Sequence, residues 1–317
     1  MWMYASTVFL SAFLLFQVQP MIAKMILPWF GGTASVWATC LLFFQAALLA
    51  GYGYPHGVVK RLPPLRQWLL HAALLALALA ALPILPDPKW KPATPELPAA
   101  RILALLGLTV GLPYFLLSTT APLVQAWFAR AHPGRSPYRL YALSNLGSML
   151  ALLSYPALIE PALTLKQQAW GWSGGFAVFA ALCALTGWKS VRGAAAAQAA
   201  KEGCEDPPAP TALMHALWAA LAMAPSMLLL ALTTHMTTDL APIPFLWVLP
   251  LALYLLSFIL SFDAPRWYQR RWFLAALPLA LGGLLWLVKL GPEARPDLRL
   301  MIAGFSACFF VACMVCH

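Results

Sequence analysis

Charged residues are scarce in this sequence. Asp, Glu, Lys and Arg make up 9% of its 317 residues, whereas soluble globular domains carry about 25%. Hydrophobic residues make up 62% and gather in long apolar runs. A water-exposed surface cannot be built from this composition. The sequence therefore predicts an integral membrane protein whose main partner is the lipid bilayer.

Signatures of catalysis and of cofactor binding are also missing. The sequence has no glycine-rich nucleotide loop after a strand, no H-E-x-x-H metal pair and no nucleophile beside a base. We expect no cofactor and no metal, and whether this chain has enzymatic activity is left open. The formal net charge is +10, but the basic residues form short clusters between apolar runs. That distribution argues against a nucleic-acid partner.

The six cysteines lie mostly inside apolar runs and predict no disulfide framework. Cys313-Met-Val-Cys316-His317 has the C-x-x-C-H spacing of c-type haem attachment. It lies at the end of an apolar segment, whereas attachment requires an exposed one, so we interpret the spacing as coincidental. The segment from Tyr4 has no basic leader and no small-residue cleavage site, and we expect the first helix to be retained.

Ten segments are long and apolar enough for spanning helices, which need about 20 residues. The predicted fold is all-α and polytopic, with spans at 4–27, 34–55, 67–85, 101–121, 138–159, 167–188, 213–236, 243–262, 271–290 and 297–316. A polar linker, 189–211, separates an N-terminal bundle of six helices, 1–188, from a C-terminal bundle of four, 212–317.

Basic residues predict the orientation. The loops after segments two, four, six and eight hold 12 of the 20 Lys and Arg residues, and the opposite loops hold eight. The more basic side of a membrane protein is usually cytoplasmic. We expect a multi-pass protein whose N-terminus is cytoplasmic.

Polar residues interrupt the first and seventh segments. Gln17, Gln19 and Lys24 surround the helix-disrupting Pro20, and polar groups at such depth usually face a protein interior or a wet cavity. The run Thr233–Asp239 includes His235, Thr238 and Asp239. Its hydroxyls either bond to the backbone one turn earlier, or the run lines a polar cavity together with the polar residues of the first segment.

Other polar positions have simpler interpretations. Asn145 lies on a face of small residues that favours helix packing, although it is a candidate ligand contact. Glu160 is interpreted as a solvated loop acid, and His71 as a side chain whose tip reaches the headgroup region. Tyr52 and Tyr54 are interpreted as interfacial anchors.

Five stretches resemble a known family. They are Gln19-Pro-Met-Ile-Ala-Lys-Met-Ile-Leu-Pro-Trp-Phe-Gly-Gly-Thr-Ala-Ser-Val-Trp37, Thr119–Phe128, Pro137–Gly147, Thr234–Asp239 and Leu246–Pro250. The chain is similar to bacterial membrane proteins in which a major-facilitator-like helical domain is fused to a spermidine-synthase-like domain. The resemblance implies the bacterial inner membrane as location and a major-facilitator-like fold that lacks its last two helices.

The two halves also resemble each other weakly at an offset of 215 residues, which places Lys24 against Asp239. If the halves are repeats, two helices are absent after His317. In the family the chain continues past a Cys-His pair into two helices and the synthase-like domain, so we expect this sequence to be a fragment.

Three functions follow as hypotheses. The resemblance implies a membrane domain that anchors or serves a cytosolic aminopropyltransferase of polyamine biosynthesis. The alternative is a secondary transporter of a polyamine or another small organic solute. A polycation pathway needs buried acids, and only Glu160 and Asp239 lie near the membrane. The third hypothesis is a scaffold without a substrate.

Overall fold

The computed structural model describes all residues except 32, 92–97, 199–210, 241–245, 265 and 291–295. The described residues form helices joined by short turns, with no strand among them. The chain divides into two compact units, an N-terminal unit (Met1–Glu202) and a C-terminal unit (Gly203–His317). The division falls inside the predicted linker, and each unit is described by itself.

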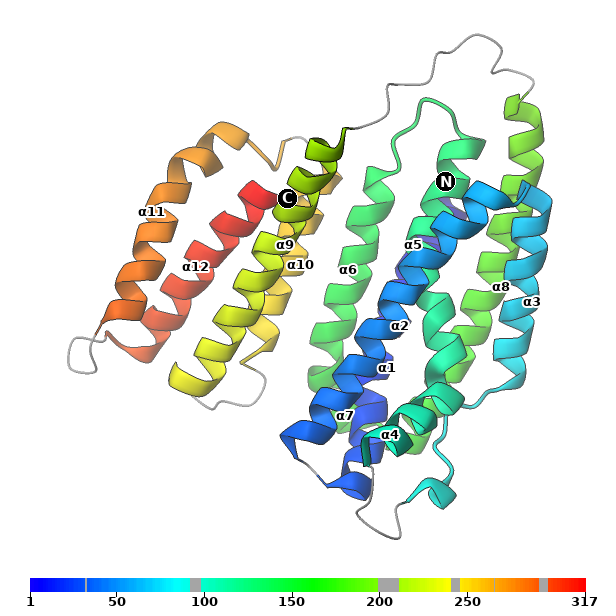
Figure 1. Ribbon diagram of the computed structural model, residues 1–317, viewed down its shortest axis with the longest axis horizontal. Helices are drawn as coiled ribbons and strands as arrows, with labels where there is room; N and C mark the ends of the chain where they lie inside the picture. The colour runs from blue at the N-terminus through cyan, green and yellow to red at the C-terminus, as the bar shows by residue number, and fades with distance from the viewer. Residues whose placement is uncertain (32, 92–97, 199–210, 241–245, 265, 291–295) are drawn as a thin grey trace. The chain divides into compact units, whose positions relative to one another are not determined.

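The described residues of the N-terminal unit form six helical passages, which Figure 1 shows side by side. Two of them are interrupted by a π-helical element, η2 or η3. In chain order the elements are α1 (Trp2–Phe30), α2 (Ala34–Arg61), α3 (Pro64–Ala80), the short η1 (Pro88–Trp90), α4 (Pro98–Leu106), η2 (Gly107–Gly111), α5 (Leu112–Ala131), α6 (Tyr138–Ser154), η3 (Tyr155–Ile159), α7 (Glu160–Ala162) and α8 (Leu165–Gln198).

The part of the C-terminal unit that the structure describes forms four passages. They are α9 (Ala212–Thr234), which continues as the π-helical η4 (His235–Leu240), then α10 (Val248–Asp263), α11 (Arg270–Lys289) and α12 (Leu298–Cys316). Its core is built around Phe305 and Phe309, both at most 1% exposed. The His317 ring stacks on Phe258, and its Nδ1 lies 2.9 Å from Ser257 Oγ. The last residues of the C-x-x-C-H run thus have packing contacts.

Eight helices among the described residues are long and apolar enough to cross a membrane. The chain is therefore a helical, multi-pass membrane protein. Each of the ten predicted segments coincides with a helix, but α3 and α10 have only 17 and 16 residues. At 1.5 Å per residue such helices are about 25 Å long, short of the roughly 30 Å hydrocarbon core. The number of spans stays a prediction.

The fourth predicted segment, 101–121, is longer in the structure and runs through α4, η2 and α5 to Ala131. The predicted segment ended at residue 121, directly after the polar run that begins with Ser118. Those hydroxyls bond to their own helix, with Ser118 Oγ 2.7 Å from the Phe115 carbonyl and Thr120 Oγ1 2.9 Å from the Leu116 carbonyl. Because the hydroxyls are satisfied locally, the run does not end the helix.

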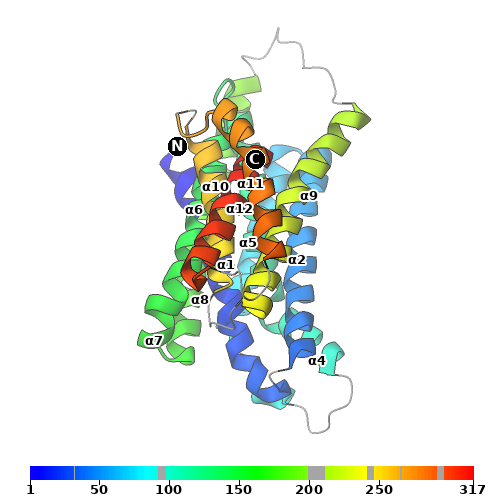
Figure 2. The same ribbon diagram turned by 90° about the vertical axis from the view of Figure 1, so that its left-hand side faces the viewer.

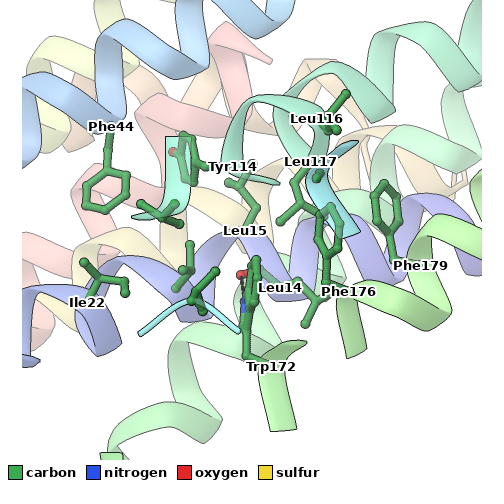
Figure 3. Close-up of a cluster of buried hydrophobic side chains, with 14 of the residues drawn as sticks. Leu14, Leu15, Ile22, Phe44, Tyr114, Leu116, Leu117, Trp172, Phe176 and Phe179 are labelled. Carbon is green, nitrogen blue, oxygen red and sulfur yellow. Dashed lines mark hydrogen bonds between the residues drawn. The ribbon is translucent and has the colours of Figure 1, made fainter. Parts of the chain in front are cut away.

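Helix α1 is the centre of the N-terminal unit. It packs against α5, α6 and α8, and Figures 1 and 2 show it alongside α6 and α8. Figure 3 shows Leu14 of α1 beside the aromatic rings of Trp172 and Phe176 of α8. Trp172 Nε1 donates to the Leu14 carbonyl over 2.9 Å. This core fixes the positions of the polar residues of α1.

The basic clusters of the N-terminal unit share one end. The α2–α3 turn with Arg61, the α5–α6 loop with Arg135 and the C-terminal part of α8 with Lys189 lie at the same end as the N-terminus (Figure 1). The positive-inside rule requires such an arrangement. The side of the membrane on which this end lies stays a prediction.

Candidate functional site

The three polar residues of α1 have different environments. Gln19 Nε2 donates to the Tyr114 hydroxyl on α5 over 3.0 Å. Lys24 forms an ion pair with Glu160 of α7. Gln17 is 9% exposed, and its Nε2 has no hydrogen-bond partner. Only Gln17 therefore has unused hydrogen-bonding capacity.

Helix periodicity explains this division. At 3.6 residues per turn, positions seven apart lie about 20° from each other around the axis, and positions two apart lie about 200° apart. Gln17 and Lys24 therefore share one face of α1, and Gln19 lies on the opposite face, toward Tyr114. The structure does not gather the three side chains into one cavity.

A cavity of about 110 Å³ lies beside Gln17. Helix α1, the π-helical η3, the following turn and α8 build its walls. Its lining residues are Gln17, Met21, Tyr155, Ile159, Leu163, Gln168, Gly171 and Trp172. Of these residues, only Gln17 was predicted from the sequence to be a site residue.

Hydrogen bonds fix the polar part of the wall. The Tyr155 hydroxyl donates to Gln168 Oε1 over 3.1 Å, and Gln168 Nε2 donates to the Leu163 carbonyl over 2.8 Å. Trp172 Nε1 donates a hydrogen bond to the Leu14 carbonyl. These three side chains therefore support the wall, and the Gln17 amide is the group they leave for a ligand.

The π-helical turn η3 positions two of the wall residues, Tyr155 and Ile159. Pro156 lies inside it and has no backbone N–H to donate, which favours a break in the regular α-helical ladder. Single π-turns inside helices are frequently found at functional sites. The Tyr-Pro pair in an apolar run is the sequence signal that could have marked this wall.

The pairing of Lys24 with Glu160 corrects the interpretation of Glu160 as a solvated loop acid. Glu160 begins the short helix α7, and its side chain is 28% exposed, against 47% for Lys24. A partly exposed pair of this kind contributes about 0–1 kcal/mol to stability. Its chemical effect is that neither charge is left free beside the cavity.

The side chain of Asn145 forms a hydrogen bond within its own helix. Its Nδ2 donates to the Tyr141 carbonyl over 2.9 Å, one turn earlier in α6. The small face around it packs against α1, where a Cβ added to Gly147 would lie 2.6 Å from the Phe9 carbonyl oxygen. The geometry agrees with the helix-packing interpretation of this face. Asn145 does not line the cavity beside Gln17.

The candidate residues of the seventh segment belong to the other unit. Thr238 Oγ1 donates to the Thr234 carbonyl over 2.7 Å, and Thr237 Oγ1 to the Thr233 carbonyl over 2.8 Å. The His235 ring packs edge-on against Phe305 at 5.2 Å. The hydroxyls thus bond to the backbone one turn earlier. The side chain of Asp239 lies outside the described residues, and a cavity shared with α1 stays a prediction.

His71 is buried, which corrects its placement in the headgroup region. It is 1% exposed, and neither ring nitrogen has a hydrogen-bond partner. Its ring lies 5.9 Å from that of Tyr54, whose hydroxyl is also buried without a partner, rather than anchored at an interface. Gln67, one turn earlier on α3, is also 1% exposed and accepts from Trp127 Nε1 over 3.2 Å.

The signal for this buried polar face was the i, i+4 spacing of Gln67 and His71. Residues four apart lie on one helix face, and the rest of α3 is almost entirely apolar. The buried polar face formed by Gln67 and His71 was not predicted, because His71 was interpreted without its neighbour one turn earlier.

Comparison of the chain with models of protein families, with curated proteins and with solved structures finds no match.

Proposed function

We propose that this chain is the integral membrane domain of a spermidine-synthase-like fusion protein of the bacterial inner membrane. The resemblance implies that the synthase-like domain transfers an aminopropyl group from decarboxylated S-adenosylmethionine to a diamine. The membrane domain would anchor that domain or handle its substrate or product. A major-facilitator-like arrangement with ten spans in this chain is part of the proposal.

The observation that supports it most is the position of the motif. The stretch Gln19–Trp37, which carries the clearest resemblance, includes the second half of α1, the central helix of the N-terminal unit. Its residues Gln19 and Lys24 contact Tyr114 and Glu160 of other helices. A motif that joins helices in this way suits a packed helical membrane domain, whereas a single anchoring helix would not need it.

The test uses the complete coding sequence. We expect the region beyond codon 317 to encode two helices and a glycine-rich nucleotide-binding domain. Membranes that contain the complete protein should transfer a labelled aminopropyl group to putrescine, and matched membranes that contain only residues 1–317 should not. A downstream region without such a domain, or a complete protein without transfer activity, would refute the proposal.

The cavity beside Gln17 favours a second candidate, a secondary transporter of a small organic solute. Among the described residues of the N-terminal unit the carboxylates are Asp87 and Glu160. Asp87 lies 3.8 Å from Lys89, and Glu160 pairs with Lys24. No free carboxylate in that described part is available to a polyamine, so this geometry favours an uncharged solute. Uptake of labelled putrescine into proteoliposomes should then not exceed that of protein-free liposomes.

A further inference from the structure

One polar atom of the cavity lining, the uncharged Gln17 Nε2, is buried without a hydrogen-bond partner. Tyr155, Gln168 and Trp172 use their polar atoms within the wall. The Gln17 amide is 9% exposed, and its Nε2 has no partner. A buried donor without a partner is destabilising. A bound molecule that accepts a hydrogen bond from this nitrogen would remove that penalty.

The rest of the lining is apolar and carries no charge. Met21, Ile159 and Leu163 supply aliphatic or thioether surface, and Trp172 supplies a ring. The nearest ionic side chains along the sequence are Glu160, which pairs with Lys24, and Lys166, which is exposed at the start of α8 and does not line the cavity. An ion that entered would lose its hydration without gaining a counter-charge. The lining therefore selects against cations and anions alike.

Size sets a second limit on the ligand. A cavity of 150 Å³ in another protein holds benzene, so a cavity of about 110 Å³ holds about five non-hydrogen atoms. Gly171 forms one wall and is exposed, and a Cβ added there would meet no atom within 4 Å. A ligand slightly larger than the cavity can therefore extend past this residue.

We propose that the cavity binds a small uncharged molecule with an apolar body and one carbonyl or hydroxyl oxygen, which accepts a hydrogen bond from Gln17 Nε2. The ligand class excludes the polyamines that the resemblance suggests. The inference does not depend on the synthase-like fusion, because it uses only residues of the N-terminal unit. Either proposal can fail without the other.

The test compares three probes of similar size that differ in charge. Isobutyramide is uncharged, isobutyrate is an anion and isobutylamine is a cation. Binding to the full chain in lipid nanodiscs is measured by saturation-transfer NMR, with empty nanodiscs as the control for partition into lipid. We expect saturable binding of isobutyramide and none of the two ions.

Three variants locate the site. Gln17→Leu should weaken isobutyramide binding about three- to ten-fold, the loss of one net hydrogen bond. Gly171→Leu should abolish saturable binding because it fills the open wall. Gly174→Leu is the matched control: it lies on the same helix, is exposed, has equally open space at its Cβ and does not line the cavity. It should bind like the unmodified chain.

Three results would overturn the inference. They are the absence of saturable isobutyramide binding, binding that survives Gly171→Leu, and equally tight binding of isobutyrate or isobutylamine. Neither glycine substitution meets a neighbouring atom at Cβ, and Gln17→Leu removes an unsatisfied amide, so we expect all three variants to fold. Thermal unfolding of each variant confirms this before binding is measured.

Discussion

The closest approach between α1 and α6 gives the sharpest prediction about stability. At Gly147 an added Cβ would lie 2.6 Å from the Phe9 carbonyl oxygen, and the obstructing atom is backbone that no side-chain rotation can remove. Gly147→Ala must therefore push the two helices apart. Small residues at helix contacts allow such approach in membrane proteins, and this glycine is buried.

The size of the effect follows from the geometry. Ordinary contact at a Cβ begins at 3.4 Å, so the two backbones must separate by about 0.8 Å. A gap of about 0.5–1 Å removes a quarter to a half of the dispersion energy of each contact between the two helices. Overpacking of this kind costs about 1–3 kcal/mol. Replacing glycine by alanine inside a helix gains about 1 kcal/mol. The matched change Gly174→Ala has only this gain, because its Cβ meets no neighbour.

The difference between the two variants isolates the packing cost, since the propensity gain is common to both. We expect Gly147→Ala to unfold more easily than Gly174→Ala by about 1–3 kcal/mol. Reversible unfolding in mixed micelles, followed by tryptophan fluorescence, measures this difference. Equal stability of the two variants would show that α1 and α6 do not approach each other as the structure describes.

Three further predictions test other contacts. Lys24→Glu and Glu160→Lys singly should each lower the unfolding free energy by up to about 1 kcal/mol, and the double exchange should restore it; additive losses would refute the pairing. Gln67→Leu leaves the donors of Trp127 and Arg130 without their acceptor and removes the donor to the Leu62 carbonyl, so it should cost about 1–3 kcal/mol in thermal unfolding; unchanged stability would refute these bonds. Reporter fusions at positions 62, 133, 200 and 268 should report the cytoplasm, and those at 92 and 293 the outside. A periplasmic signal at position 200 would overturn this topology.

The helices could be predicted because their signal is local. A run of apolar residues forms a helix in the membrane regardless of its neighbours, since only internal hydrogen bonds can satisfy its backbone. The ten predicted segments therefore coincide with helices, and the errors lie at their ends. The segment at 101–121 was too short, because α5 continues ten residues further, to Ala131, through Pro122.

The partners of the polar residues could not be predicted in the same way. Gln17 was correctly expected to face a protein interior, but its cavity is built from residues about 140 to 155 positions later in the chain. Glu160 and Lys24 are 136 positions apart. Lys24 and Glu160 were each interpreted from their neighbours in the sequence. Their ion pair depends instead on how α7 packs against α1. His71 was misplaced for the same reason, because its burial depends on Tyr54 and Trp127 of other helices.

The spacing of the polar residues along α1 could be predicted from the sequence and bears on the cavity. The seven-residue spacing places Gln17 and Lys24 on the same face of α1, and Met21 between them lines the cavity. Across from this face, Ile159 lines the cavity and Glu160 follows it directly. The ion pair thus joins α1 to α7. Glu160 lies one residue beyond the lining residue Ile159, and Lys24 lies about one turn beyond the lining residue Met21. Although the pair contributes little to stability, it links α7, which directly follows η3, to the face of α1 that carries Gln17.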